Sequence, residues 1–287
     1  MYSARIETDS GQIFNFGYDY GTVFDIDPLT GVDVDISTSQ GFQQVGETVE
    51  SQSVGGITRS IKGTIIKDAR QTAAKMLKIL LPFTAGRLYF KNGNEEYFCY
   101  ITIKKTPVIL TDETSKITRF SLQVYCHNPF WLGTTEKAYI IGGYTPAFQF
   151  PVIYDTHTFG ELQSDAFVDC YNNGVAQTEF NIKFAALYTV TNYGVIDVVT
   201  LEELYFNDTL ELGEIVNVYR KNGRLYAEKT VGGVTTDIFS KLADDSNLLY
   251  LKTGSNVLKA TATDGLSGLQ VSVSFYEGQA GVLNATA

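Results

Sequence analysis

The stretch Arg59-Ser-Ile-Lys-Gly-Thr-Ile-Ile66 opens the part of the sequence that decides the fold, and Cys126-His-Asn-Pro-Phe-Trp131 closes it. Between them, apolar residues recur at i, i+3, i+4, i+7 and i+8, which is the spacing of one face of a helix. They are Ala73, Met76, Leu77, Leu80 and Leu81. Asp68 stands at the N-cap position with Gln71 as the second half of a capping box, and Pro82 lacks the N–H needed to continue the helix. The pattern predicts one amphipathic helix after a strand at 59–66.

Signals for antiparallel strands follow this helix. Apolar and polar residues alternate through residues 118–126, the period of a strand with one buried face. Residues 88–90 and 97–103 flank Asn92-Gly93, a dipeptide that tolerates the positive φ of a tight hairpin turn. We therefore expect an antiparallel sheet with a single helix laid across it.

This ordered set of motifs resembles the N-terminal domain of the distal tail proteins of long-tailed bacteriophages. The matching features are Arg59-x-Ile61-x-Gly63, the helix, Leu81-Pro82, Gly86-Arg87-Leu88, the hairpin, Pro107 and the closing Cys126-x-Asn128-Pro129-Phe130-Trp131. The closing motif is the most specific of them. The resemblance implies an antiparallel β-sandwich or split barrel with one packed α-helix, similar to a tail-tube subunit.

Composition and charge exclude several classes of protein. The chain has 287 residues and 13% aromatic residues, which suits a β-rich globular protein with two cores. Its 22 Lys and Arg against 32 Asp and Glu give a net charge of −10, which disfavours specific binding to nucleic acid or an anionic membrane. Neither a secretion signal nor an apolar run of membrane-spanning length is present, so we expect synthesis in the cytoplasm and release by lysis.

The candidate metal ligands do not form a recognisable site. Cys99, Cys126 and Cys170 are widely spaced without a Cys-x-x-Cys, which predicts buried apolar side chains instead of a zinc site or a disulfide. Asp25, Asp27, Asp33 and Asp35 are clustered carboxylates, but the spacing of a calcium-binding loop is not met. Val32, Val34 and Ile36 alternate with two of these acids, which predicts a half-buried strand. We expect no metal and no cofactor.

A long polar, glycine-spaced segment covers residues 37–56. Loops of this length in compact domains are usually functional or mobile. In the family that the chain resembles, and in tail-tube subunits, the corresponding region lies at subunit contacts. Two interpretations stay open: a loop that reaches a neighbouring copy or a stacked ring, and a solvated surface loop.

The second half of the chain consists of short strand-like runs separated by turn signals. The runs are residues 166–171, 178–184, 200–206, 215–219, 224–228 and 269–275, and the turns are Asn172-Asn-Gly174, Asn222-Gly223, Gly232-Gly233 and Asp264-Gly265. This succession without helices predicts a β-sandwich. We place an N-terminal domain at 1–133, a linker at 134–150 and a C-terminal domain at 151–287.

The second half also resembles the C-terminal domain of the distal tail proteins. The matching residues are Asn173-Gly174, Leu212-Gly213-Glu214-x-Val216-x-Val218, the Asn222-Gly223 hairpin and Leu251-x-x-Gly254-x-Asn256. The resemblance implies a galectin-like or carbohydrate-module-like β-sandwich. A carbohydrate-binding module that attaches to the host cell wall is accordingly the alternative function, with Tyr188, Tyr193, Tyr205 and Tyr226 as candidate stacking residues.

Catalytic patterns are missing from the sequence. His127 and His157 are the two histidines, and no Gly-x-Ser-x-Gly elbow, P-loop or Gly-x-Gly-x-x-Gly accompanies them. Adjacent carboxylates at Glu95-Glu96 and Glu202-Glu203 point to opposite faces of a strand and do not share a proton. We therefore name no catalytic residue and expect no enzyme.

Together these features predict a structural protein of the phage virion. The resemblance implies a distal tail hub: a hexameric ring that joins the tail tube protein to a tail-tip, fibre or lysin protein and passes DNA through its channel. An acidic channel wall would let DNA pass without binding. We expect the protein in the virion tail tip or baseplate, after assembly in the host cytoplasm.

Overall fold

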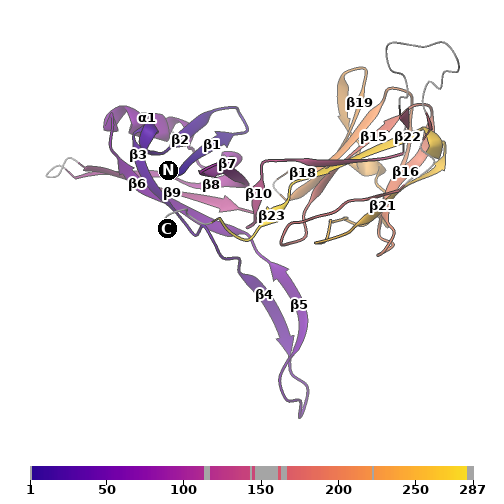
Figure 1. The fold of residues 1–287 in the computed structure, drawn as a ribbon, viewed down its shortest axis with the longest axis horizontal. Helices are drawn as coiled ribbons and strands as arrows, with labels where there is room; N and C mark the ends of the chain where they lie inside the picture. The colour runs from indigo at the N-terminus through magenta and orange to yellow at the C-terminus, as the bar shows by residue number, and fades with distance from the viewer. Residues whose placement is uncertain are drawn as a thin grey trace. The chain divides into compact units, whose positions relative to one another are not determined.

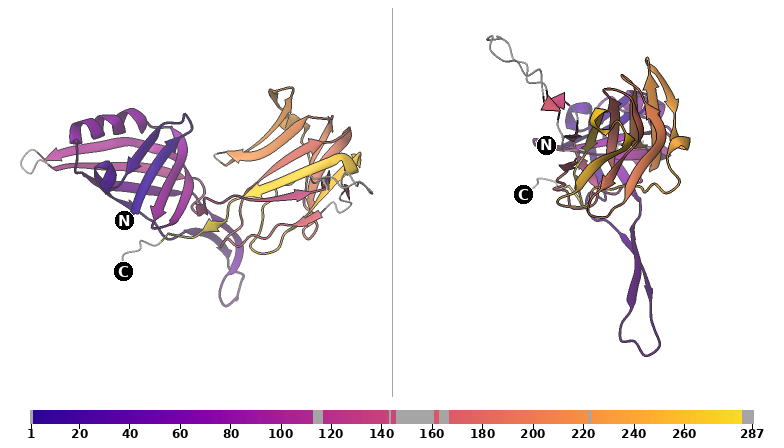
Figure 2. Two further views of the ribbon diagram at one scale, coloured as in Figure 1. Left: turned by 45° about the horizontal axis from the view of Figure 1, so that its top comes forward. Right: turned by 90° about the vertical axis from the view of Figure 1, so that its right-hand side faces the viewer.

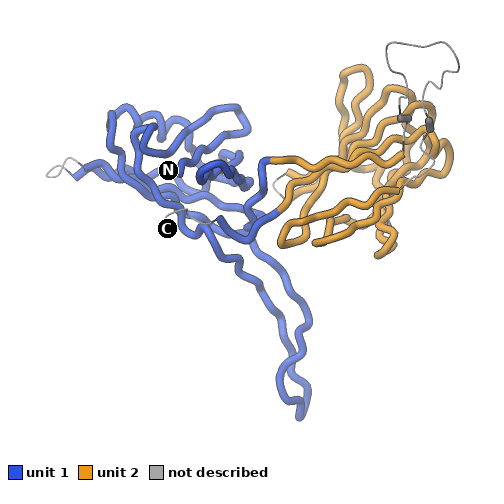
Figure 3. The backbone as a smooth tube through the Cα atoms, in the orientation of Figure 1, with its two compact units in different colours: residues 1–134, 278–287 blue, residues 135–277 orange. Residues whose placement is uncertain are grey.

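The computed structural model describes residues 2–112, 117–142, 144–145, 161–162, 167–221 and 223–282. The chain folds into two compact units, residues 1–134 with 278–287 (unit 1) and residues 135–277 (unit 2) (Figure 3). Both units consist mainly of antiparallel strands, as predicted. The chain enters unit 2 at Thr134–Thr135 and returns to unit 1 at Glu277–Gly278.

Unit 1 contains one large antiparallel sheet (Figure 1). Its main path runs β2-β1-β7-β8-β9-β6-β3, and the short strands β10 and β23 pair beside β8. The strands are β1 (Tyr2–Thr8), β2 (Ile13–Phe16), β3 (Thr22–Asp27), β6 (Ile57–Ile65), β7 (Ala85–Asn92), β8 (Glu95–Asp112), β9 (Ile117–Cys126), β10 (Trp131–Gly133) and β23 (Gly278–Gln279). A 3-10 turn, η1 (Tyr18–Tyr20), precedes β3.

The sheet of unit 1 curls around an aromatic core. Phe16 of β2 lies 5.7 Å from Phe24 of β3 and 5.8 Å from Phe120 of β9, measured between ring centroids. Since β2 and β3 are the two ends of the strand order, their contact closes the sheet on itself. The alternation predicted for 118–126 is confirmed, because Phe120, Leu122, Val124 and Cys126 are all buried. The Asn92-Gly93 turn is confirmed too, with φ +62° at Gly93 between β7 and β8.

The predicted helix is α1 (Ala69–Ile79), which lies against the sheet of unit 1 (Figures 1 and 2). The side chains of Met76 and Leu80 are buried in this core. The predicted stripe is wrong by part of a turn, since the side chains of Leu77 and Leu81 are 41% and 49% exposed. Ala69 and Ile79 are packed against the core in their place. Helical periodicity gives the spacing of a buried face, but the neighbouring strands decide where its edge falls.

The predicted capping box is also wrong. Asp68 has a left-handed backbone (φ 48°, ψ 48°) and its side chain makes no capping hydrogen bond. The chain enters the helix directly from the Gly21–Lys67 contact, where Lys67 N–H donates to the carbonyl of Gly21. Asp tolerates the left-handed backbone that the chain needs to reverse direction here. In this conformation its carboxylate does not cap the helix.

Residues 34–54 form a β-hairpin where the sequence predicted a polar loop after one half-buried strand. β4 (Val34–Ser39) pairs with β5 (Thr48–Val54), and the pair makes a separate two-stranded sheet. Figures 1 and 2 show this hairpin standing clear of the rest of unit 1. All residues of both strands are exposed, so Val34 and Ile36 are not half-buried in the single chain.

Unit 2 is a sandwich of two antiparallel sheets, as predicted. One sheet has the order β11-β22-β15-β18-β19-β20, and the other has the order β14-β21-β16-β17. The bounds are β11 (Lys137–Ile141), β14 (Phe167–Asp169), β15 (Phe180–Ala186), β16 (Val190–Asp197), β17 (Glu203–Leu210), β18 (Ile215–Lys221), β19 (Arg224–Val231), β20 (Val234–Asp237), β21 (Val257–Asp264) and β22 (Leu269–Phe275). Short elements complete the unit: β12 (Tyr144–Thr145), β13 (Glu161–Leu162), η2 (Phe239–Lys241) and η3 (Leu266–Gly268).

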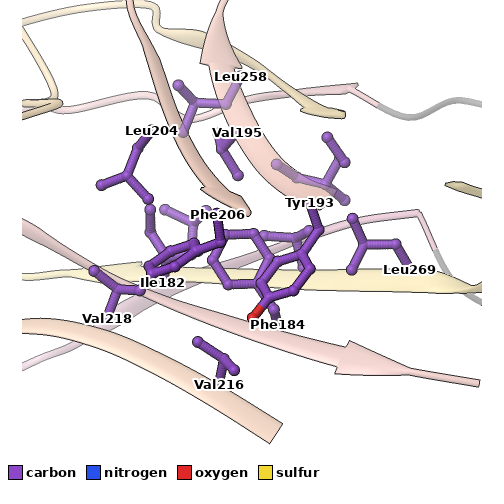
Figure 4. Packing of buried hydrophobic residues seen from close by; sticks show 14 of the residues in the cluster. Ile182, Phe184, Tyr193, Val195, Leu204, Phe206, Val216, Val218, Leu258 and Leu269 are labelled. Carbon is purple, nitrogen blue, oxygen red and sulfur yellow. The ribbon is translucent and has the colours of Figure 1, made fainter. Parts of the chain in front are cut away.

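The core of unit 2 lies between these sheets (Figure 4). Phe184 of β15 meets Tyr193 of β16 and Phe206 of β17 at centroid distances of 5.2 and 6.1 Å. Aliphatic side chains from both sheets surround this aromatic group. Burial of this whole core is the main contribution to the stability of unit 2, since hydrophobic burial dominates folding.

Strand β11 lies inside the stretch 134–150 that the sequence assigned to a linker. It pairs with β22 from Lys137 opposite Phe275 to Ile141 opposite Val271. Ile141 is fully buried in the sandwich core. The rest of the expected linker from residue 146 onward lies outside the described residues, and the domain limits 1–133 and 151–287 stay predictions.

Candidate assembly surfaces

The hairpin β4–β5 exposes an apolar face on one side. Val34 lies opposite Val54 and Thr38 opposite Val49, so both β5 valines share the face of Val34 and Ile36. These four side chains are 45–57% exposed. An isolated two-stranded hairpin is marginally stable in water, and an exposed apolar face on one marks an interaction surface.

The turn at the end of the hairpin is ordered by its polar side chains. Gln44 Oε1 accepts a hydrogen bond from Gly41 N–H at 2.9 Å, and Gln44 Nε2 donates to Thr48 Oγ1 at 2.9 Å. The apolar side chains of the turn face water instead, with Phe42 96% exposed and Val45 100% exposed. The hairpin thus uses its polar groups internally and presents its apolar groups outward, which is the reverse of an ordinary solvated loop.

The charge of the hairpin has a single sign. Asp33, Asp35, Glu47 and Glu50 lie on or beside it and are exposed. No Lys or Arg occurs between Arg5 and Arg59. A partner surface complementary to this hairpin is therefore apolar and carries basic residues.

A groove of that kind lies on the outer face of the unit 1 sheet. It has a volume of about 610 Å³ and crosses β3, β6, β9 and β8. Exposed Val23, Val108 and Leu110 line it, with Lys62 and Arg119 as its basic residues and Asp25 as its acid. We call this the apolar groove.

Gly63 lies beneath the apolar groove, on the core-facing side of β6, opposite the buried Phe24 and Phe120. A Cβ at this position would lie 2.1 Å from the carbonyl oxygen of Val23 and 2.8 Å from the ring of Phe120. Any side chain would therefore have to displace the backbone of β3 or the Phe120 ring, so the close packing of β3, β6 and β9 beneath the groove depends on glycine at this strand position.

The closing motif of unit 1 holds the chain that leads into the hairpin. The Trp131 indole N–H donates to the carbonyl of Leu29 at 3.0 Å. The buried guanidinium of Arg59 donates to the carbonyls of Pro28 and Pro129, the latter at 2.6 Å, and lies 4.6 Å from the Trp131 ring. Charge-assisted bonds to carbonyls on both segments tie the base of the hairpin to the core. Sequence reasoning noted both residues but missed this connection, because it joins segments about 70–100 positions apart.

The three cysteines are free and buried, as predicted. Cys99 Sγ and Cys126 Sγ lie 3.6 Å apart inside the unit 1 core. Burial and the charge of Asp169 raise the pKa of Cys170 to about 12, so this thiol stays protonated. Within the described ranges, no three His, Cys, Asp or Glu residues come together as a metal-binding group, Asp25, Asp27, Asp33 and Asp35 included.

The residues considered for catalysis have structural neighbours. His127 stacks on Tyr100 with centroids 6.0 Å apart, and burial lowers its pKa. His157 lies outside the described residues. Glu95 accepts from the Tyr97 hydroxyl, whereas Glu96 forms a 2.8 Å ion pair with Arg5, so the two adjacent carboxylates have separate partners. Glu203 accepts from Thr261 and Glu202 from Thr200, so that pair is divided in the same way.

The predicted tyrosine platform does not form. Tyr193 is fully buried in the core, and the Tyr188 hydroxyl is bonded to Ser267 at the η3 end of the sandwich. Tyr205 bonds Thr263 on the β14-β21-β16-β17 sheet, whereas Tyr226 lies on the opposite sheet, stacked on Tyr219. Their sequence pattern could not separate these locations, since tyrosine is an ordinary strand residue. No helix in the described part of the chain is both long and apolar enough to span a bilayer.

Comparison with known proteins gives matches at the level of structure. No protein-family model matches the chain, and no curated protein matches its sequence. The SPP1 Dit (gp 19.1) protein, described as a paradigm of hub adsorption apparatus in Gram-positive infecting phages, superposes with a TM-score of 0.62 at 15% identity. The match covers 97% of this chain and 99% of that chain.

Two structures of the phage p2 baseplate in its activated conformation, with Sr and with Ca, contain similar chains. Each superposes with a TM-score of 0.54 at 9% identity. The matches cover 96% and 95% of this chain and 98% and 97% of those chains. Across nearly its whole length, therefore, the chain has the fold of these phage hub and baseplate proteins.

Proposed function

We propose that the protein is a structural component of a phage virion, the distal tail hub that joins the tail tube to the tail tip or baseplate. The observation that carries this proposal is the exposed apolar hairpin β4–β5 on a chain whose whole length follows the fold of phage hub proteins. A monomer gains nothing from apolar side chains held in water at the end of a hairpin that pairs with no other described strand. A neighbouring subunit would remove that cost.

The proposed contact places the hairpin of one copy in the apolar groove of the next. Phe42, Val45 and the valine face would cover Val108 and Leu110, while Glu47 and Glu50 would face Lys62 and Arg119. Because hairpin and groove are different surfaces of one chain, the contact is head-to-tail, and such contacts close into a ring when the rotation allows. We propose six copies, the number that the resemblance noted in the sequence implies.

The ring would surround a channel for DNA and contact other tail proteins. Each copy contributes a net charge of −10, and an acidic wall repels the phosphate backbone and so prevents DNA from binding to the channel. The tail tube protein would contact one end of the ring and a tip, fibre or lysin protein the other. We assign the chain no catalytic role, cofactor or metal, and we place it in the virion after assembly in the host cytoplasm.

Disulfide trapping tests the contact directly. The double variant Val45→Cys with Leu110→Cys is expected to give a ladder of covalent multimers under mild oxidation, because the proposed contact brings the two new thiols together. The native cysteines do not interfere, because they are buried. The matched control is Val45→Cys with Leu212→Cys, since Leu212 is 73% exposed on unit 2, outside the apolar groove.

Solution mass tests the ring itself. Light scattering and negative-stain imaging are expected to find a closed multimer of the purified chain. A protein that stays monomeric at every concentration, together with particles that build intact tips without it, would show that the proposed function is wrong.

A further inference from the structure

The chain returns to unit 1 after it has formed unit 2, and Figure 3 colours the returning residues with unit 1. Their first two residues form β23, in which Gly278 lies opposite Leu132 and Gln279 opposite Trp131 of β10. β10 pairs in turn with β8, so β23 joins the sheet of unit 1. We call residues 278–282 the return strap.

The end of the return strap contacts the segment that leads into the β4–β5 hairpin. Gly281 forms an antiparallel bridge with Thr30, and Val282 N–H donates to the carbonyl of Leu29 at 3.2 Å. The same carbonyl accepts the indole N–H of Trp131 at 3.0 Å. The side chain of Val282 is buried in the core of unit 1. The strap therefore joins the entry of the hairpin to the core.

Residues 28–33, between β3 and β4, form the first root of the hairpin. In the described part of the chain, they pair with no strand other than the return strap. The side chains of Arg59 and Trp131 bond the carbonyls of Pro28 and Leu29, ahead of the Thr30 bridge. The hairpin is a separate two-stranded sheet, so its direction depends on how its roots are held.

The second root, between β5 and β6, is held by close packing. A Cβ at Gly56 would lie 2.2 Å from the Tyr125 hydroxyl oxygen and 2.8 Å from the carbonyl oxygen of Cys126. Gly55 and Gly56 have no side chains to restrict their backbone angles, and glycine loses more conformational freedom on ordering than any other residue. This root alone therefore does not fix the direction of the hairpin, and the first root has to contribute.

The return strap follows residues that are fixed on unit 2. Glu277 forms a 2.5 Å ion pair with Lys137 and accepts a hydrogen bond from Asn173 N–H at 2.9 Å. Phe275, the last residue of β22, is buried in the core of the sandwich. Since the strap comes after unit 2 in the chain, it reaches the first root only once the whole of unit 2 has been synthesised.

We propose that the return strap fixes the first root of the β4–β5 hairpin and makes unit 1 competent for assembly only after the chain has been made past unit 2. A hairpin with a loose root samples many directions, and binding then costs the free energy of ordering it. A hairpin that is already fixed avoids this cost. The role in assembly rests on the proposed function, in which the hairpin contacts the next copy.

Two glycines of the return strap provide a matched pair of substitutions. A Cβ at Gly281 would lie 2.9 Å from Thr30 Cα and 2.8 Å from Thr30 Cγ2, whereas a Cβ at Gly278 would lie 3.5 Å from Phe130 Cβ. The first pair of distances is a steric overlap, and the second is an ordinary van der Waals contact. Neither glycine has a positive φ. Gly281→Ala is therefore expected to push the strap away from Thr30, and Gly278→Ala to leave it in place.

Electron-resonance distance measurement tests whether the strap fixes the hairpin. Nitroxide labels at Val45→Cys and Phe83→Cys place one probe at the tip of the hairpin and one elsewhere on unit 1, both at exposed positions, and the native cysteines are buried. Dilution with unlabelled protein removes distances between copies. The parent protein and Gly278→Ala are expected to give a narrow distribution. Gly281→Ala and a chain that ends at Glu277 are expected to give a broader one.

Solution mass of the same proteins without labels tests the role in assembly. The parent protein and Gly278→Ala are expected to form the multimer, whereas Gly281→Ala and the shortened chain are expected to lose it at the same concentration. Circular dichroism reports whether each protein is folded. If the shortened chain does not fold, Gly281→Ala still decides the outcome, because it changes a single contact of the strap.

Equal distance distributions in the parent protein and Gly281→Ala would overturn the strap, and so would equal broadening in Gly278→Ala and Gly281→Ala. A multimer of Gly281→Ala as stable as that of the parent protein, despite a broadened distribution, would overturn the role in assembly. If the parent protein itself stays monomeric, the proposed function is wrong. The distance distributions then still decide whether the strap fixes the hairpin.

Discussion

Two grooves of the described structure, one on each unit, lie on the outer faces of antiparallel sheets and differ in the side chains that line them. The apolar groove of unit 1 presents Val23, Val108 and Leu110 beside Lys62 and Arg119. The groove of unit 2 has a volume of about 400 Å³ and crosses β22, β15, β18 and β19. It presents the polar side chains of Asn181, Lys183 and Asn217 beside Tyr219, which stacks on Tyr226. Covering an apolar surface lowers the free energy of the protein, whereas a polar surface is stable in water and exchanges ligands readily. The groove of unit 1 is therefore the one suited to permanent assembly.

Substitutions at the tip of the hairpin are expected to have the largest effect, which is the loss of assembly through the apolar groove. Phe42→Asp with Val45→Asp is expected to abolish the multimer and leave the monomer folded, because both side chains are almost fully exposed in the single chain. Light scattering reports the mass and circular dichroism the fold. Phe83→Asp with Leu212→Asp is the control, since these residues are 91% and 73% exposed outside the hairpin. Loss of the multimer in both variants would mean that general exposed apolarity drives association.

Two substitutions at the helix of unit 1 test whether a buried apolar side chain contributes more to stability than an exposed one. Leu80→Ala is expected to lower the free energy of unfolding by about 2–5 kcal/mol, since it leaves a cavity under α1. Leu77→Ala, on the exposed side of the same helix, is expected to cost below about 0.5 kcal/mol. Chemical denaturation of the two variants measures both values. Equal losses would mean that α1 is rotated relative to the core.

The acids beside the hairpin test the channel. Asp33→Lys with Asp35→Lys is expected to slow DNA ejection severalfold if these exposed carboxylates line the passage, because lysines bind phosphate. The measurement is the rate of DNA release from purified particles carrying the variant. Unchanged ejection from particles with intact tips would remove these two residues from the channel wall.

The stability of unit 2 is expected to depend slightly on pH through Glu277. Burial opposes ionisation of Glu277, but the hydrogen bonds from Lys137 and from the Asn173 backbone lower its pKa overall. A carboxyl with a lowered folded-state pKa adds stability that is complete above its unfolded pKa of about 4.3 and is lost as the pH falls through the folded value. Denaturation of the parent protein and of Glu277→Gln is therefore expected to converge as the pH falls below about 4. A difference that persists at acid pH would assign the effect to another interaction.

Local pattern predicted much of this fold from particular residues. The alternation at 118–126 and the glycine turn after Asn92 led directly to β9 and the β7–β8 hairpin, because each depends on neighbours within a few positions. The apolar stripe at 73–81 correctly predicted a helix, but it did not predict which side chains are buried. Leu77 is exposed and Ile79 is packed against the core, because the sheet covers one of them and not the other. The alternation at 32–36 was identified as a strand, but its burial was misjudged since no sheet of the same chain covers it.

Both grooves were beyond prediction from sequence. Val23, Val108 and Leu110 come from strands far apart in the chain, and only the pairing of β3, β6, β9 and β8 brings them together. Tyr226 was singled out in the sequence, but its partner Tyr219 was not, because the pair depends on the β18–β19 register.

By itself, the amino-acid sequence determined the strand and turn periods, the single helix of the first half, the burial of the cysteines and the net negative charge, since these follow from each residue and its near neighbours. Only the tertiary structure decided which apolar side chains are exposed to water and which polar side chains have no hydrogen-bond partner in the protein. It also decided how Arg59 and Trp131 hold the base of the hairpin. The physical reason is that exposure and hydrogen bonding are properties of a packed surface, and strand pairing over long sequence separations creates that surface.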